Sequence, residues 1–356
     1  MKTFFANMSH GNEPYVLAAN VGISLGDVII PQIYHEKQRQ ILKRWFGSNP
    51  RIYLDRRGGN ILRPLLFDGD YASYINRVVR YKKALKRKLE RHLKNFEAVS
   101  LTGEKKSFAN PDVELNIGSP FRTSARQSFY IFPGLLSEYA ENCPVKVENI
   151  GAFIDFAREN EAGHEKIFIP EINSFSYRKR KPKKNEISTP PLKRKGNHKE
   201  RINQAILVTL PGAATPHSEL IGLAGDIQKY GFDTYRLAED TKLHGKVAET
   251  HEIIFNPNLK AVLARAGWGT LWLCQVAEKP IITPCWKQTD DPEIYHNNLT
   301  IKELGLGVVY KNFGGKVIAE ALSKVGKIKE LNKGLFDKFG TLDGISFVQQ
   351  KIKEML

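Results

Sequence analysis

The second half of the chain alternates short apolar runs with helical patterns, and this alternation limits the fold more than any other feature. The apolar run 205–210 is typical of a buried strand, and the Thr-Pro pair at 215–216 predicts a helix over 218–230. Further strands are expected at 233–237, 252–255, 261–264, 281–283 and 307–310. Strands separated in this way by helices pack into a parallel sheet.

The first half has a looser version of the same alternation. Its expected strands are 3–6, 27–30, 51–54, 98–101, 113–117, 145–147 and 166–169. Since 356 residues favour two domains, we predict an α/β protein with two Rossmann-like domains whose parallel sheets face each other across a cleft. The expected boundaries are a first domain over 1–177, a basic linker over 178–202, a second domain over 203–330, and a C-terminal helical segment over 331–356 that packs back on the first domain.

Charge is concentrated in two segments. The chain carries a formal net charge of +16. Nine Lys and Arg residues and one acid lie between Arg77 and Lys94, and eleven Lys and Arg residues and two acids lie between Arg178 and Arg201. These segments account for the whole excess, so the remainder is close to neutral. A local basic region of this kind favours an anionic partner.

The first basic segment also has a helical repeat of apolar residues. They occur at positions 74, 78, 81, 85, 89, 93 and 96, which predicts an amphipathic helix with a cationic polar face. Two interpretations remain open: a surface helix whose apolar stripe packs on its own domain, or a helix that docks on an anionic surface such as a membrane. The segment 178–202 has no periodicity and is expected to be a flexible connection.

The compartment is indicated by what the sequence lacks. Three cysteines lie far apart, which excludes a disulfide framework and a cysteine zinc site. No apolar stretch is long enough for a membrane-spanning helix. We therefore expect a cytoplasmic protein, either soluble or peripheral on the inner face of a membrane.

One strand-to-helix turn in the second half has the chemistry of a phosphate site. It contains Arg265, Gly267, Trp268, Gly269 and Thr270. Glycines let the backbone approach a ligand, a helix N-terminus favours an anion, and arginine and threonine add donors. The alternative is a tight turn whose glycines serve geometry alone.

The segments that follow this turn resemble those of a known protein family. Lys-Pro-Ile-Ile-Thr-Pro at 279–284, the acidic stretch from Asp290 to Asn298, and Glu-Leu-Gly-Leu-Gly at 303–307 follow in order. Over 205–310 this order resembles the donor-binding region of nucleotide-sugar glycosyltransferases with the GT-B fold. The similar groups are the UDP-glycosyltransferases and the lipid-linked N-acetylglucosaminyltransferases.

The resemblance implies roles for individual residues. Arg265 stands where a diphosphate-contacting histidine is common, and the Gly267 to Thr270 turn matches the family's turn. Glu293, four residues before Asn297, stands in the place of the carboxylate that binds sugar hydroxyls; alternatively it is a solvated loop acid. Where the family often has a glutamate for the ribose and a glutamine after the sugar-binding acid, this chain has Leu273 and Ile294, so the donor's identity stays open.

Three further residues complete the expected donor site. Gln288 is a candidate for contact with the sugar. Gly212 and Ala213 precede a helix, where their backbone N–H groups either face the donor or form a structural turn.

The first loop of the chain is the expected place of the catalytic base. In the family this loop often carries a histidine that deprotonates the acceptor, and here His10 is the candidate, with Glu13 in reserve. The alternative is that His10 only caps the following helix.

The function expected from this resemblance is transfer of a sugar from a nucleoside diphosphate, a UDP-sugar being the commonest choice, to an acceptor hydroxyl. Inversion at the anomeric carbon and independence of metal and cofactor are expected, because a helix N-terminus and an arginine can stabilise the leaving diphosphate. The acceptor is a lipid-linked compound or one at an anionic membrane surface contacted between Arg77 and Lys94. Alternatives are a glucosyltransferase acting on nucleic acid, a nucleotide-sugar 2-epimerase, and a non-catalytic protein that binds anions or nucleic acid.

Overall fold

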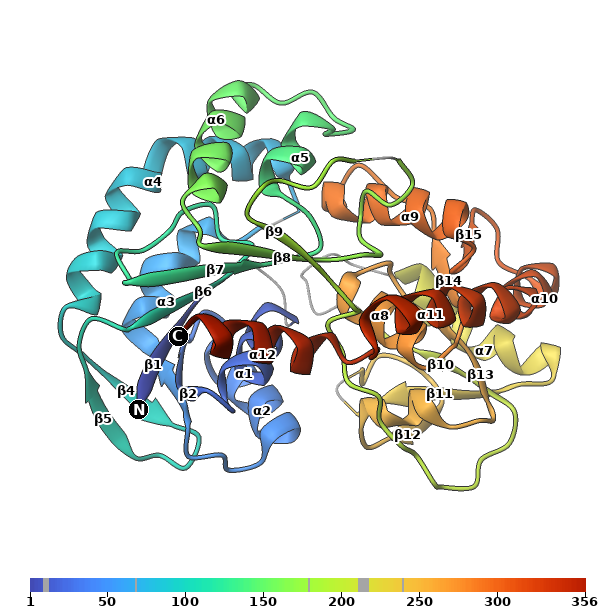
Figure 1. The fold of residues 1–356 in the computed structure, drawn as a ribbon. Coiled ribbons are helices and arrows are strands. Elements are labelled where there is room, and N and C mark those ends of the chain that lie inside the picture. Colours follow the sequence, from blue (N-terminus) through green and yellow to red (C-terminus); the bar gives the residue numbers. More distant parts are fainter. Residues whose placement is uncertain (9–12, 68, 179, 211–217, 239) are drawn as a thin grey trace. The chain divides into compact units, whose positions relative to one another are not determined.

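The computed structural model describes residues 1–8, 13–67, 69–178, 180–210, 218–238 and 240–356 (Figure 1). The chain divides into two compact units. Unit 1 comprises Met1–Ile169, Lys181–Ser188 and Ile345–Leu356, and unit 2 comprises Pro170–Arg180 and Thr189–Gly344. The basic segment 178–202, expected as a linker, thus contributes to both units.

Unit 1 is built on a nine-stranded sheet with the order β5-β4-β3-β2-β1-β6-β7-β8-β9. The strands are β1 (Lys2–Met8), β2 (Gly26–Pro31), β3 (Ile52–Asp55), β4 (Phe96–Ser100), β5 (Lys105–Phe108), β6 (Val113–Ile117), β7 (Gln127–Ile131), β8 (Lys166–Pro170) and β9 (Glu186–Thr189). The parallel strands in the order β3-β2-β1-β6-β7-β8 have the Rossmann arrangement. The first strand lies in the middle, and successive strands are added first on one side of it and then on the other. The predicted parallel sheet is confirmed.

Three details of this sheet differ from the prediction. β4 pairs with β3 and β5 in antiparallel fashion. Between β4 and β5 the reason is a turn of a few residues at Gly103, whose φ is +100°, which is too short for a parallel crossover. β5, β7 and β9 were not expected as strands. The run 145–147, expected as a strand, lies in a half-buried to exposed loop, because a short apolar run does not by itself specify a strand.

The helices of unit 1 surround this sheet. They are α1 (Glu13–Gly22), α2 (His35–Phe46), α3 (Arg56–Leu62), the short 3-10 helix η1 (Arg63–Leu65), α4 (Tyr71–Leu93), α5 (Leu136–Glu141), α6 (Ile150–Ala162) and α12 (Gly344–Met355). α12 lies beside α1 (Figure 1), where the Gln349 amide donates to the Asn20 carbonyl at 2.6 Å. Fully buried Phe5, Ile29 and Leu115 form part of the core between strands and helices.

The two basic segments have different structures. α4 begins at the Asp70 cap, whose carboxylate accepts from the N–H groups of Ala72 and Ser73. Most of its apolar stripe is buried in unit 1, with Val78 and Leu89 fully inaccessible, whereas Leu85 is half-buried and Tyr81 is exposed. Between the basic clusters of 178–202, β9 extends the unit 1 sheet; the expectation of a flexible connection is therefore wrong for this part.

Unit 2 contains a six-stranded, fully parallel sheet with the order β12-β11-β10-β13-β14-β15. Its strands are β10 (Ala205–Val208), β11 (Asp233–Leu237), β12 (Lys246–Ala248), β13 (Leu259–Leu263), β14 (Ile281–Pro284) and β15 (Gly307–Tyr310). Numbered within the unit, this is the order 3-2-1-4-5-6, and the strand order reverses between β10 and β13. In such sheets ligands bind at the carboxyl ends of the strands near this reversal.

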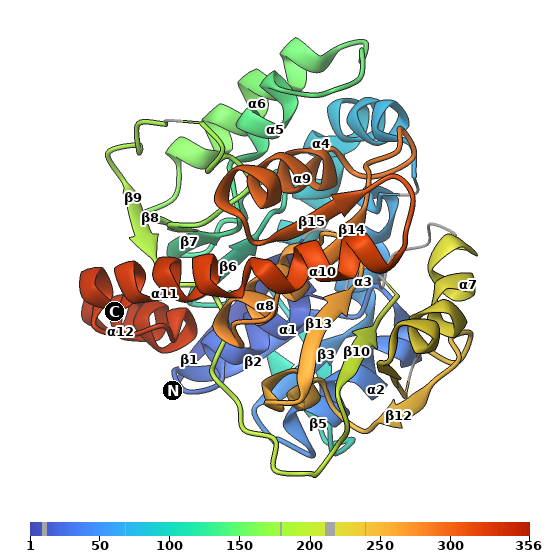
Figure 2. The same cartoon turned by 90° about the vertical axis from the view of Figure 1, so that its right-hand side faces the viewer.

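The helices of unit 2 are α7 (Ser218–Ile227), η2 (Gln228–Tyr230), η3 (His251–Phe255), α8 (Trp268–Val276), α9 (Pro292–Leu304), α10 (Gly315–Ser323) and α11 (Val325–Phe339). α10 packs on β13, β14 and β15 and continues into α11 (Figure 2). The helix predicted over 218–230 is confirmed, with a 3-10 last turn. The strand expected at 252–255 is wrong: Thr250 accepts from the Glu252 N–H at 3.3 Å and starts the 3-10 turn η3 instead.

None of the helices in the described ranges has both the length and the apolar character needed to cross a bilayer.

Candidate functional site

The candidate site lies at the carboxyl ends of β13 and β14, which are neighbours in the unit 2 sheet. The chain leaves β13 through residues 264–267 into α8, and leaves β14 through residues 285–291 into α9. The two connections contact each other, since the Asn297 amide donates to the Ala266 carbonyl at 2.5 Å. The topology thus brings together two segments that the sequence placed about thirty residues apart.

Arg265 is buried and forms an ion pair with Asp290, which is also buried. One guanidinium nitrogen also donates to the Cys285 carbonyl at 3.2 Å, and Asp290 accepts from the Lys287 N–H at 2.7 Å. Arg265 therefore holds the 285–291 loop against the turn after β13. Contact between Arg265 and a diphosphate stays a prediction, and it would require a phosphate oxygen to share the guanidinium with Asp290 or to replace it.

Glu293 lies in the first turn of α9, behind the cap formed by Asp291, which accepts from the Glu293 N–H at 2.8 Å. Glu293 is half-buried, and its carboxyl lies next to the backbone N–H of Trp268 and 3.4 Å from the Asn297 amide nitrogen. Burial, followed by the nearby charge of Asp291, raises the pKa of Glu293 to about 8. Glu293 is therefore not a solvated loop acid, and its raised pKa favours the protonated form, which can donate as well as accept hydrogen bonds.

The first turn of α8 is partly open. Gly267, Gly269 and Thr270 are half-buried, whereas Trp268 is buried. The N-cap residue Gly267 has no side chain that could accept from this turn, and the Trp268 N–H is bound by the Glu293 carboxyl. The N–H groups of Gly269 and Thr270 lie in the first turn and lack intrahelical acceptors. This turn is able to bind an anion.

A buried hydrogen-bond chain fixes the side chains behind this turn. The Trp268 indole donates to the Ser174 hydroxyl at 2.6 Å, and that hydroxyl donates to the Asn297 carbonyl oxygen at 2.8 Å. The remaining face of the Asn297 amide is directed to Ala266 and Glu293. Asn297 is fully buried and its amide contacts Glu293, so a direct contact of Asn297 with a donor stays a prediction.

The geometry can be compared with known proteins. No family model matches the sequence, and no curated protein sequence matches it either. Solved structures do match along the whole chain: the calicheamicin glycosyltransferase has 11% identity and a TM-score of 0.61, with 99% of this chain and 97% of that chain covered. The glycosyltransferase SnogD from Streptomyces nogalater has 13% identity and a TM-score of 0.55, with 100% and 99% covered. An Arabidopsis thaliana protein complexed with UDP-L-rhamnose has 11% identity and a TM-score of 0.58, with 99% and 97% covered.

The chain has the GT-B fold. The two sheets of Rossmann order are the physical basis of this likeness. Because sequence identity is so low, the likeness defines the fold, and the residues of the site must be judged by their own geometry.

The GT-B fold unites some of the expected donor residues. Arg265, the turn from Gly267 to Thr270, Glu293 and Asn297 lie together, and Gln288 is exposed on the 285–291 loop. Glu13 is the half-buried first residue of α1. His10, Gly212 and Ala213 lie outside the described residues.

Sequence reasoning missed two residues of this site. Asp290 was seen only as part of an acidic pair, although a buried arginine requires a carboxylate partner, and this requirement could have indicated it. Ser174 lies 94 residues before Trp268, and nothing in the sequence pattern connects the two.

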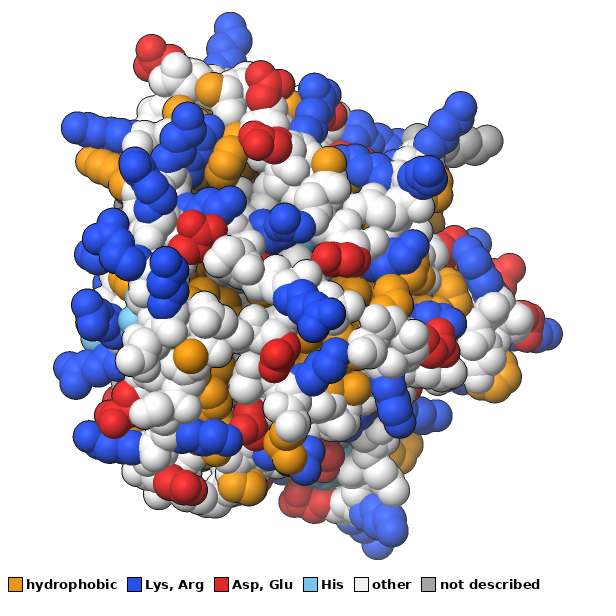
Figure 3. All heavy atoms as spheres, turned by 60° about the vertical axis from the view of Figure 1, so that its left-hand side comes forward, with side chains coloured by type: hydrophobic (Ala, Val, Ile, Leu, Met, Phe, Trp, Pro, Cys, Tyr) orange, Lys and Arg blue, Asp and Glu red, His pale blue; other side chains and the backbone are white. Residues whose placement is uncertain are grey.

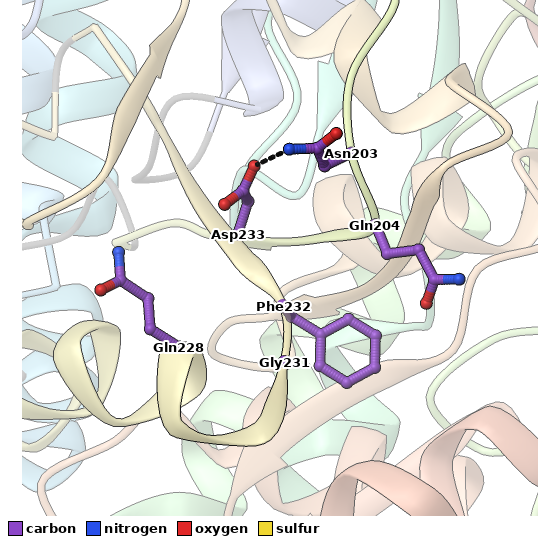
Figure 4. Close-up of a pocket in the computed structure, with 6 residues that line it drawn as sticks. All are labelled: Asn203, Gln204, Gln228, Gly231, Phe232 and Asp233. Atoms are coloured by element: carbon purple, nitrogen blue, oxygen red, sulfur yellow. Dashed lines mark hydrogen bonds between the residues drawn. The ribbon is translucent and has the colours of Figure 1, made fainter.

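One hollow of unit 2 lies elsewhere (Figure 4). It has a volume of about 600 Å³ and is lined by Asn203, Gln204, Gln228, Gly231, Phe232 and Asp233. These residues lie at the amino ends of β10 and β11, on the edge opposite the candidate site. The Asp233 carboxylate is already bound by Asn203 at 3.3 Å and Lys246 at 2.7 Å.

In the described part of the chain no group of three His, Cys, Asp or Glu side chains is placed to hold a metal ion.

Proposed function

We propose that this chain is a glycosyltransferase that moves a sugar from a nucleoside diphosphate, in the first place a UDP-sugar, to an acceptor hydroxyl. The observation that carries the proposal is the partly open first turn of α8 beside the Glu293 carboxyl, at the carboxyl edge of a Rossmann-ordered sheet. Solved structures with the same fold are titled as complexes with UDP and with UDP-L-rhamnose, which supports this class of donor.

In the proposed donor complex the diphosphate lies at the N-terminus of α8. The N–H groups of Gly269 and Thr270 and the Thr270 hydroxyl would donate to its oxygens, and the helix dipole would stabilise its charge. Glu293 would meet the sugar hydroxyls, to which a protonated carboxyl can both donate and offer its carbonyl oxygen.

In the proposed transfer step the acceptor oxygen forms a bond with the anomeric carbon, while the bond to the diphosphate oxygen breaks and its electron pair stays on the diphosphate. The acceptor's proton passes to His10, with Glu13 in reserve, as the resemblance implies. Attack from the face opposite the leaving group would invert the anomeric centre. The N–H groups at the N-terminus of α8 and the positive end of its helix dipole would stabilise the negative charge of the leaving diphosphate, so that no metal would be needed.

The proposal is tested by release of free nucleoside diphosphate from a panel of sugar nucleotides, with and without alcohols as acceptors. We expect one nucleotide to raise the thermal unfolding temperature, and its sugar form to be consumed. An epimerase would instead return the sugar nucleotide with inverted C2 and would need no acceptor. If no sugar nucleotide protects the protein against thermal unfolding and none is turned over, both the glycosyltransferase and the epimerase proposals are refuted.

Matched variants separate the proposed roles. Thr270→Val should weaken donor binding, because it removes one hydroxyl donor without changing side-chain volume. His10→Ala should lower turnover while leaving donor affinity close to that of the unchanged protein. Equal losses of both quantities in His10→Ala would indicate a structural role.

A further inference from the structure

The outward face of α4 carries a line of cations. Its members are exposed and spaced by three or four residues: Arg80, Lys83, Arg87, Arg91 and Lys94. This spacing places them along one side of the helix over about 21 Å, and we call this line the basic stripe. Within the described chain none of the five forms an ion pair, and the one acid of the helix, Glu90, lies beside the stripe and is bound to Lys86 at 4.0 Å.

The opposite face of α4 is not available to a partner. Ile75, Val78 and Leu89 are fully buried, and the helix packs on α3 and α6. A free amphipathic helix can turn its apolar side into a lipid layer, but here that side belongs to the core of unit 1. Any attraction exerted by α4 is therefore electrostatic, and it acts without insertion.

We propose that the basic stripe docks unit 1 on the anionic headgroups of a lipid bilayer. Figure 3 turns this side of the molecule forward and shows Lys and Arg side chains gathered over its left part, with few Asp and Glu side chains among them. Anionic headgroups attract basic residues near a membrane surface within the screening distance of the solution.

The shape of the stripe favours a bilayer over a nucleic acid. A straight line of charges can meet a plane along its whole length in any in-plane orientation, whereas on the curved surface of a duplex it does so only when it lies along the helix axis. A helix can enter the major groove when its flanks are free, but α4 is held between α3 and α6. Apart from Tyr81 at its margin, the stripe also lacks exposed rings on which single-stranded bases could stack.

The strength of docking can be measured by partition into vesicles. At about 1 kcal/mol per basic residue, each cation removed should lower the partition coefficient about fivefold. Arg80→Gln/Arg87→Gln/Arg91→Gln should therefore lower it about 100-fold, and Arg87→Gln alone about fivefold. Glutamine keeps the helix propensity, so the thermal unfolding temperature should stay close to that of the unchanged protein.

The matched control removes the same charge elsewhere. Lys327, Lys329 and Lys333 are exposed on α11 in unit 2, and their replacement by glutamine gives the same net charge. The full-length protein and its variants are mixed with phosphatidylcholine vesicles that contain or lack phosphatidylserine, at low and high salt. We expect binding only with phosphatidylserine, loss at high salt, and a large effect of the α4 substitutions alone.

Other outcomes overturn the proposal. Equal effects of the α4 and α11 substitutions would show that only net charge matters. Binding to phosphatidylcholine alone would show insertion, and tighter binding to a DNA duplex than to the anionic vesicles would assign the stripe to nucleic acid. None of these measurements uses a sugar donor, so their outcome is independent of the proposed transfer reaction.

Discussion

The buried pair of Arg265 and Asp290 gives the sharpest test of the site. Their side chains are 3% and 4% exposed, so Asp290→Asn leaves a guanidinium in the interior without its counter-charge. Removing one partner of a buried pair costs about 3–5 kcal/mol. For a unit of this size, about 2–4 °C per kcal/mol corresponds to a fall in melting temperature of roughly 6–20 °C.

A double-mutant cycle separates the pair from its surroundings. Arg265→Met/Asp290→Leu replaces both charges by apolar side chains, and such exchanges are often neutral or stabilising. We therefore expect the double variant to unfold closer to the unchanged protein than the single variants Arg265→Met and Asp290→Leu do, with a coupling energy above about 1 kcal/mol in urea unfolding. If Asp290→Asn stays within about 0.5 kcal/mol of the unchanged protein, the guanidinium is not held as the structure describes.

The same double variant tests the donor site. A charge-assisted hydrogen bond to the diphosphate is worth about 1.5–3 kcal/mol, so its loss should weaken donor binding about 10- to 150-fold. Isothermal titration with the donor found in the nucleotide panel measures this. An unchanged donor affinity in a folded double variant would leave Arg265 only the role of holding the 285–291 loop.

Three further predictions concern single residues. The pKa of Glu293 is raised from 4.5 to about 8, so between these pH values the folded state binds a proton that the unfolded state has lost. The free energy of unfolding should therefore fall as pH rises from 4.5 to about 8, by at most about 1.4 kcal/mol per pH unit. Glu293→Gln should remove this slope in urea unfolding measured at several pH values. Ser174→Ala should cost about 1–3 kcal/mol, because it removes the hydroxyl that orients Asn297; thermal unfolding measures this, and no loss would exclude the buried hydrogen-bond chain. Leu89→Ala should cost about 2–5 kcal/mol, whereas Lys88→Ala on the exposed side should cost less than about 0.5; similar losses would show that the α4 stripe is not core.

The sequence predicted the fold class through local patterns. The apolar run at β10 and the glycine turn before α8 each depend on neighbours along the chain, and the structure has a strand and a turn there. The predicted helix over 218–230 is present, whereas the Thr-Pro pair expected to start it lies outside the described residues. The amphipathic repeat of α4 was also predictable, because a helix sets its own periodicity. The repeat could not tell whether the apolar side faces protein or lipid.

Tertiary structure decided which of these side chains meet. The pairing of Arg265 with Asp290 and the contact of Trp268 with Ser174 join segments that are distant in sequence, and hydrogen bonds of this kind leave no periodic pattern. The raised pKa of Glu293 likewise results from burial beside α8 and from the charge of Asp291, and neither could be deduced from the sequence pattern.

What the sequence alone determined, then, is the alternation of strands and helices and the local position of the charges, because these follow from side-chain periodicity and turn chemistry. Only the tertiary structure decided the strand order, the antiparallel edge of the first sheet and the buried partners of the site. The physical reason is that pairing between distant segments is selected by the total burial of apolar surface and by the need to compensate buried charge, and both are properties of the folded chain as a whole.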